Sequence, residues 1–430
     1  MKIRCSSLFV LALGAASLSF DLHAAGTGVL AVSGRANANL SMASSGSFVA
    51  AVWSASLANG TTDIYASVSS NGGASFAAPV RVNATPGDAR ANGEQPPRVA
   101  LAVRLSGPPE LTVIWLSKRD AATVLLSARS SDGGRSFSAA AVVPGADAAG
   151  NRGWQSLVAD SRGAVHTAWL DHRKLAEGDS QMASMHHHNG DSPAGSTVAT
   201  KPDGVAMAQL SQIYVATLGG SPAQPIAGGV CYCCKTAIAS GPSGEIYVAW
   251  RHVYPGNLRD IAFSVSRDGG RSFSGPARVS EDHWMIEGCP EDGPVLAVDR
   301  QSRVHIVWPT VVSEKGETVK ALFHAVTHDG RTFSQRTRLP SSGQANHPQI
   351  TMASDGSLVV AWDESGRGAR EIRLARGVPN AEGQVSFETK ASGIVRAGTY
   401  PAITPLNEGV LVAWTTGEPA ASTIRMEVIR

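Results

Sequence analysis

A short apolar phrase ending in tryptophan recurs seven times along the 430-residue chain, and no other feature constrains the fold as strongly. The phrases are FVAAVW at 48–53, LTVIW at 111–115, VHTAW at 165–169, IYVAW at 246–250, VHIVW at 304–308, LVVAW at 358–362 and VLVAW at 410–414. By subtraction, their tryptophans lie 62, 54, 81, 58, 54 and 52 residues apart, so the single long step marks an insertion. Runs of Val, Ile and Trp between Gly-, Asp- and Ser-rich turns are typical of buried β-strands. The sequence therefore predicts an all-β repeat architecture.

A second recurring feature is a turn that follows the third predicted strand of several repeats. The pattern S-x-[DN]-x-G-x-x-[FW] occurs at 69–76, 130–137 and 266–273, and a version one residue shorter occurs at 327–333. Glycine permits positive φ in such turns, and Asp, Asn and Ser side chains hydrogen-bond to nearby backbone amides. Because these hydrogen bonds are local, we expect the turns to be structural.

These turns resemble the Asp-box (BNR) repeat of the sialidase superfamily and related propellers, and the resemblance covers nearly all of the chain after the first 25 residues. It implies a β-propeller with blades of four-stranded antiparallel sheets. Seven phrases predict seven blades, with six as the alternative, whereas sialidases have six. The last repeat, from residue 401, offers three strands, so we expect residues 28–33 to supply the fourth and close the ring. We expect a member that is not a sialidase.

The N-terminus predicts export. Lys2 and Arg4 precede an apolar run at 8–18 and small residues at 24–25, a pattern typical of a signal peptide over residues 1–25. Residues 26–430 then form one propeller domain with a loop insertion at about 174–210, and we expect it in the periplasm or outside the cell. No later run is long enough to span a membrane. A net charge of +2, with acids and bases interspersed, argues against a nucleic-acid partner.

Polar residues gather where each repeat enters its first strand and where its second strand ends. In a propeller both positions lie on one face, and binding residues concentrate on loops that a rigid scaffold holds. The residues expected to line this face are Arg152, Asp171, His172, Arg173, Arg251, His252, Asp292 and Asp363. The expected ligand is a metal ion or a small molecule, and a protein partner is an alternative.

Four cysteines lie in the segments that lead into the fourth and fifth repeats, namely Cys231, Cys233, Cys234 and Cys289. These repeats are adjacent, so the cysteines are expected to converge. The predicted insertion adds His186, His187 and His188, and His347 leads into the sixth repeat. Thiolate and imidazole ligands together favour copper, with zinc second. The alternatives are disulfides, which form in an oxidising compartment, and a solvated histidine loop.

The resemblance also implies a competing function, an exo-α-sialidase or a related glycoside hydrolase. Sialidases hold a sugar carboxylate with three arginines and use a tyrosine nucleophile assisted by a glutamate. By position, the corresponding candidates are Arg35, Arg251, Tyr400 and Glu364, and Arg152, Arg173 or Arg396 could complete the arginine clamp. A third class is a binding scaffold for a protein or glycan, with Trp154, Tyr232 and Trp284 as contact residues.

Overall fold

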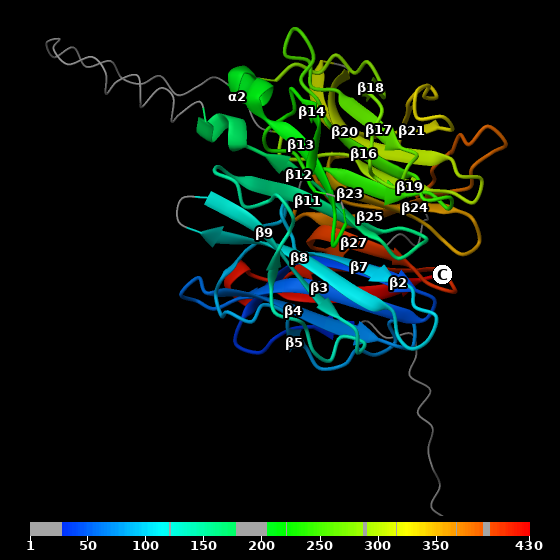
Figure 1. Ribbon diagram of the computed structural model, residues 1–430. Coiled ribbons are helices and arrows are strands. Elements are labelled where there is room, and N and C mark those ends of the chain that lie inside the picture. The colour runs from blue at the N-terminus through cyan, green and yellow to red at the C-terminus, as the bar shows by residue number, and fades with distance from the viewer. Residues whose placement is uncertain are drawn as a thin grey trace, which may run out of the picture.

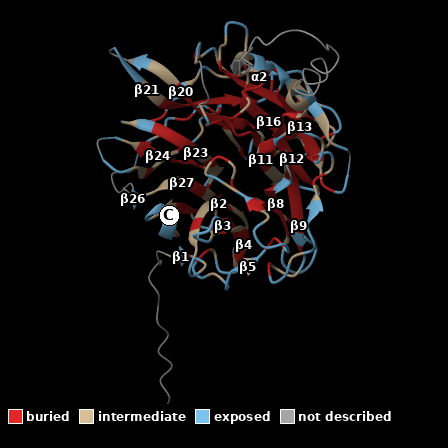
Figure 2. Ribbon diagram, turned by 90° about the vertical axis from the view of Figure 1, so that its left-hand side faces the viewer, coloured by how far each residue is buried: buried red, intermediate tan, exposed pale blue. Residues whose placement is uncertain are grey.

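Seven antiparallel sheets follow one another around a central channel (Figures 1 and 2). The computed structural model describes residues 28–119, 122–177, 204–220, 222–286, 290–314, 316–366, 368–389 and 396–430. Each sheet forms one blade, and the innermost strand of each blade contacts the innermost strand of the next until the last meets the first. The prediction of a seven-bladed propeller is therefore confirmed.

The blades are numbered in chain order, and their strands are given from the channel outward. Blade 1 consists of β2 (Ala36–Ser45), β3 (Phe48–Ser56), β4 (Thr62–Ser69) and β5 (Val80–Arg81), and blade 2 of β7 (Arg98–Ala102), β8 (Glu110–Arg119), β9 (Ala122–Ser130) and β10 (Ala141–Val142), with β6 (Ala89–Arg90) also paired to β8. Blade 3 consists of β11 (Arg152–Ala159), β12 (Val165–Asp171), β13 (Gln212–Thr217) and β14 (Gln224–Gly228), and blade 4 of β15 (Ala237–Ser240), β16 (Ile246–Arg251), β17 (Ile261–Ser266) and β18 (Ala277–Arg278).

The remaining three blades complete the ring. Blade 5 consists of β19 (Val295–Val298), β20 (Val304–Glu314), β21 (Glu317–Thr327) and β22 (Thr337–Arg338), and blade 6 of β23 (Gln344–Met352), β24 (Leu358–Ser365), β25 (Glu371–Gly377) and β26 (Arg396–Ala397). Blade 7 consists of β27 (Thr399–Pro405), β28 (Val410–Thr416), β29 (Thr423–Ile429) and β1 (Gly28–Leu30). Short helices lie between strands, among them α2 (Gly204–Leu210) and η1 (Pro419–Ala421), and no helix among the described residues is long and apolar enough to cross a membrane.

The ring is closed by pairing the two ends of the described chain. β1 is antiparallel to β29, with Leu30 opposite Ile424 and Gly28 opposite Met426. The N-terminal segment thus supplies the outermost strand of the last blade, as the sequence predicted. Closure leaves only short strand edges exposed, which suits a sheet protein of this kind.

The seven phrase tryptophans occupy the interfaces between blades, and each is at most 2% exposed. Each lies in the second strand of its blade and shares a hydrophobic cluster with residues of the preceding blade; Trp308, for example, packs with Phe263, and Trp53 packs with Leu411 across the closure. Figure 2 shows this burial as the red interior of every sheet. The repeated phrase is therefore the residue set that joins blade to blade.

The Asp-box turns hold the outer edges of the blades. In the turn after β9, Asp132 accepts hydrogen bonds from the backbone amides of Arg135 and Ser136, and the amide of Gly134 donates to Ser130 Oγ at 2.9 Å. Gly134 has φ of 84°, which a residue with a side chain rarely adopts. These interactions are local and lie between the third and fourth strands of the blade, away from the channel.

The innermost strands carry a recurring β-bulge near the channel. In blades 1, 3, 6 and 7 the register shifts there, and Asn39, Trp154, His347 and Tyr400 each adopt φ between 51° and 60°. A left-handed backbone is unfavourable for residues with side chains, and such strain concentrates at functional sites. The bulges therefore place strained backbone beside the channel.

Leu30 provides a test of the closure. Its side chain is 6% exposed and packs with Leu40 and Ile424, so we expect Leu30→Ala to lower the free energy of unfolding by about 2–5 kcal/mol. Its neighbour Val29 is 56% exposed, and Val29→Ala should change stability by less than about 0.5 kcal/mol. Denaturant titrations of both variants measure the difference, and equal effects would argue against the β1–β29 pairing.

A buried histidine pair should make stability depend on pH. His305 Nδ1 lies 3.0 Å from His324 Nε2, and burial lowers the pKa of His324 to about 3. The unfolded chain takes up a proton near pH 6.5, which folded His324 does not, so His324 alone should contribute a loss of stability of about 1.4 kcal/mol per pH unit from about pH 6.5 downward. His324→Gln should flatten this slope, whereas His328→Gln, at an exposed histidine, should leave it unchanged. Urea titrations between pH 7 and 4.5 measure these slopes. Identical slopes for the natural chain and His324→Gln would contradict the lowered pKa of His324.

Candidate functional site

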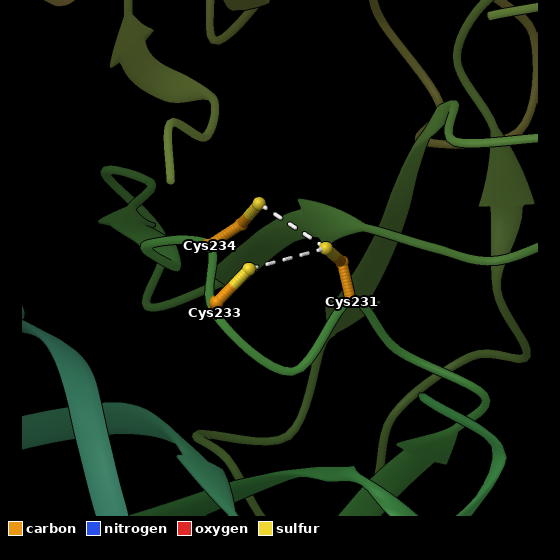
Figure 3. A group of neighbouring side chains, drawn as sticks. All are labelled: Cys231, Cys233 and Cys234. Carbon is orange, nitrogen blue, oxygen red and sulfur yellow. Dashed lines mark hydrogen bonds between the residues drawn. The ribbon is translucent and has the colours of Figure 1, made fainter. Parts of the chain in front are cut away.

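Three cysteines converge in the segment between β14 and β15. The sulfur atoms of Cys231, Cys233 and Cys234 all lie within 4.8 Å of one another. Cys231 Sγ is 3.4 Å from Cys234 Sγ and 3.8 Å from Cys233 Sγ, so Cys231 is the centre of the group (Figure 3). Their exposures are 1%, 4% and 1%, which places the sulfurs inside the protein.

The three cysteines differ in redox state. Cys231 and Cys234 are free thiols, whereas Cys233 is disulfide-bonded. The partner of Cys233 lies outside the described residues, as do Cys289 and the predicted ligands His186, His187 and His188. The group therefore contains both free thiols and a disulfide-bonded cysteine, which the sequence analysis had treated as alternatives.

Two buried arginines adjoin the sulfur group. Arg259 Nη1 donates a hydrogen bond to Cys231 Sγ at 3.2 Å, and Arg251 donates to the backbone carbonyls of Arg259, Pro309 and Asp292. Both arginines are at most 1% exposed, and within the described chain neither forms an ion pair with a carboxylate. A hydrogen bond from Cys234 and the charges of the two arginines lower the pKa of Cys231 to about 6, which favours its thiolate. Burial raises the pKa of Cys234.

The surroundings of the sulfurs are mostly apolar. Ala208 of α2, Val253 and the partly buried Trp154 and Tyr232 pack against the cysteines. Two predicted face residues, His172 and His252, directly follow β12 and β16, and burial lowers the pKa of each to about 4. Neutral imidazoles therefore adjoin the cysteine segment, and His172 Nε2 is buried with no hydrogen-bond partner among the described residues.

A second cluster surrounds His347 at the channel. His347 Nδ1 is 2.5 Å from Asp363 and Nε2 is 2.9 Å from Glu94, while its backbone amide donates to Asp292 at 2.9 Å. Burial alone would lower the pKa of His347, but the carboxylates outweigh burial and raise it. His347 is therefore held in an acidic clamp and does not join the cysteines.

Tyr400 stacks on this histidine. Their ring centroids are 3.9 Å apart, and the Tyr400 backbone amide donates to Asp363 at 2.8 Å. Burial raises the pKa of the tyrosine to about 12. A Cβ on Gly93 would lie 1.9 Å from Tyr400 Cζ, so a glycine at 93 is required for the ring to take this position.

Asp292 links the two clusters. It lies 3.2 Å from Lys235 Nζ and 3.3 Å from Lys320 Nζ, and although burial acts in the opposite direction, these ammonium groups lower its pKa. Lys235 directly follows Cys234 in the chain. The sulfur group and the histidine cluster are thus separated by one lysine–aspartate pair.

The arginines considered for a carboxylate clamp already have partners within the described chain. Their partners are Asp63 for Arg35, Asp171 for both Arg152 and Arg173, backbone carbonyls for Arg251 and Glu427 for Arg396. Glu364 accepts the Trp362 indole N–H at 2.9 Å, and Asp171 likewise accepts the Trp169 indole. These residues anchor the strand tryptophans and the blade interfaces.

Several residues of the two clusters were not singled out from the sequence. They are Glu94, Arg98, Lys235, Arg259 and Lys320. Glu94, Arg98 and Lys235 lie at the start of innermost strands, where Asp292 and His347 were selected, so the same positional signal could have identified them. Arg259 and Lys320 lie beyond the second strand, and nothing in the sequence pattern points to them.

The sequence matches no protein-family profile and no curated protein. Among solved structures, an ulvan lyase of polysaccharide lyase family PL25 superposes with a TM-score of 0.51 at 9% identity, over 92% of this chain and 94% of that chain. A protein of unknown function from Dyadobacter fermentans gives 0.49 at 16% identity, over 77% and 94%, and the Hadza microbial sialidase Hz136 gives 0.45 at 12%, over 86% and 73%. At these identities the likeness establishes only the β-propeller fold.

Proposed function

We propose that this Asp-box propeller is an exported protein that binds a soft metal ion, copper(I) before zinc, through Cys231, Cys233 and Cys234. The observation that carries the proposal is the approach of three buried sulfur atoms to within 4.8 Å of one another. Soft thiolate ligands select Cu(I) and zinc over harder ions. The predicted signal peptide is consistent with this role outside the cytoplasm.

Charge balance supports a thiolate site. Arg251 and Arg259 are buried without a carboxylate partner in the described chain, and an uncompensated buried charge is costly. Three thiolates with one Cu(I) ion carry a net negative charge, which these two guanidinium groups would offset. The hydrogen bond from Arg259 to Cys231 would also orient that ligand, as partners of metal ligands commonly do.

The disulfide at Cys233 limits when the metal can bind. A disulfide sulfur is not a thiolate, and the thiolate is the form that ligates metals. The proposed three-sulfur site therefore requires reduction of this bond by an external thiol, which is itself oxidised to a disulfide, whereas the oxidised protein retains two thiols. Metal binding should consequently follow the redox state of the chain.

Metal reconstitution tests the proposal. Reduced protein should bind one equivalent of Cu(I), and removal of the central ligand by Cys231→Ser should abolish this binding in competition with a Cu(I) chelator. Arg259→Gln should weaken binding about 10- to 100-fold, as loss of a partner of a metal ligand typically does. Met285→Ala removes an exposed thioether outside the group and serves as the control. The proposal fails if the reduced chain binds neither Cu(I) nor zinc, or if Cys231→Ser binds as tightly as the natural chain.

A carbohydrate-active enzyme is the second candidate. It is favoured by the strained Tyr400, which stacks on His347, while Glu94 lies 2.9 Å from that histidine. A tyrosine beside a carboxylate and an imidazole can exchange protons with a substrate or act as a nucleophile. The nearest reaction class is hydrolysis by a sialidase-type glycosidase, although the described arginines form no three-residue clamp.

A fluorogenic sialoside assay decides this second candidate. If the protein is a sialidase, Tyr400→Phe should reduce kcat by at least about 100-fold, in the range of losses seen when an acid–base group is removed. Tyr65→Phe is the matched control, because Tyr65 stacks on Trp53 in the core of blade 1. Absence of turnover by the natural chain, or equal turnover by both variants, would exclude the role of Tyr400.

A further inference from the structure

The central channel contains a cavity to which all seven blades contribute. Its volume is about 180 Å³, and its lining includes Asn39, Arg98, Ser156, Lys235, Leu296, His347 and Tyr400, one residue from each blade or from the segment leading into it. This volume is below the roughly 300–1,000 Å³ of pockets that hold drug-sized ligands. A ligand of this cavity must therefore be small.

The lining of the cavity has one sign of charge. Arg98, Lys235 and His347 are its basic residues, and no aspartate or glutamate among the described residues lines it. Acidic partners lie outside this lining, where Asp292 contacts Lys235, and Asp363 and Glu94 contact His347. The carboxylates thus fix the positions of the cations while leaving the cavity wall positive, and a concave site of one sign concentrates the opposite charge.

Arg98 supplies the hydrogen-bonding groups for an anion. Its Nε donates to the backbone carbonyl of Gln155 at 3.0 Å, and within the described chain its two terminal nitrogens make no hydrogen bond or ion pair. Burial lowers the pKa of Arg98 to about 10, with Glu94 acting in the opposite direction, so the guanidinium remains charged at neutral pH. A guanidinium fixed through Nε presents its remaining donors in the geometry that fits a carboxylate.

We propose that the channel cavity binds a small organic acid, no larger than a monosaccharide acid, whose carboxylate is held by Arg98 and Lys235. The partly buried Tyr400 and His347 form the adjoining wall and would contact the remainder of the ligand. The cysteine sulfurs do not line this cavity, so the inference stands apart from metal binding. The proposed binding of an acid also requires no catalytic role for Tyr400.

Calorimetric titration of the full chain tests the proposal. Glucuronate and glucose are used as a pair, since they have the same ring and differ in the carboxylate. We expect glucuronate to bind and glucose not to bind. Arg98→Gln should weaken glucuronate about 10- to 100-fold, the cost of losing a charged hydrogen-bonding group, and Arg98→Lys should have an intermediate effect. Arg129→Gln, at an exposed arginine paired with Glu110, should leave the affinity unchanged.

The outcomes separate this site from the metal site. In the absence of added metal, Cys231→Ser should bind glucuronate like the natural chain. Equal binding of glucose and glucuronate would overturn the proposal, as would inorganic phosphate binding more tightly than glucuronate or an unchanged affinity in folded Arg98→Gln. A thermal unfolding transition establishes that Arg98→Gln is folded. If Arg98→Gln does not fold, Arg98→Lys, which keeps the buried charge, replaces it in the comparison with the natural chain.

Discussion

The packing of one tryptophan into every interface between blades is the interaction on which the rest of this molecule depends. Each indole ring is buried against the preceding blade, and the interface that closes the ring has the same construction, with Trp53 against Leu411. A ring of this kind is stable only if the last interface forms, and the pairing of β1 with β29 joins the ends of the chain for that purpose. The rigid wall of the channel follows from this closure.

The same tryptophans connect the core to polar residues near the ends of the strands. The indole N–H of Trp53, Trp169 and Trp362 donates to Asn37, Asp171 and Glu364, respectively. These polar residues are fixed by the core, which makes them structural supports. The bulged residues Asn39, His347 and Tyr400 are among those that line the channel cavity, and the surrounding strands impose their left-handed backbone.

The fold could be predicted from the sequence because its signals are local and repeated. Each tryptophan phrase predicts one strand, and each Asp-box turn predicts one hairpin. Seven copies of the phrase predict seven blades. The site is harder to predict because its partners come from different blades. Position alone indicated that Cys231, Cys233 and Cys234 converge, but the contacts of Arg259 with Cys231 and of Lys320 with Asp292 depend on how neighbouring blades are rotated. No local pattern encodes that rotation.

The proximity of the two clusters has an electrostatic consequence. Lys235 belongs to the cavity wall and follows Cys234, and its ammonium group is paired with Asp292, which also receives Lys320 and the amide of His347. A negatively charged metal–thiolate group and an anion in the cavity would therefore lie on either side of the same buried lysine–aspartate network. Interactions between buried charges are only weakly screened in the low-dielectric interior of a protein. Occupancy of one site should thus weaken the other through like-charge repulsion, with the lysine–aspartate network reducing the effect.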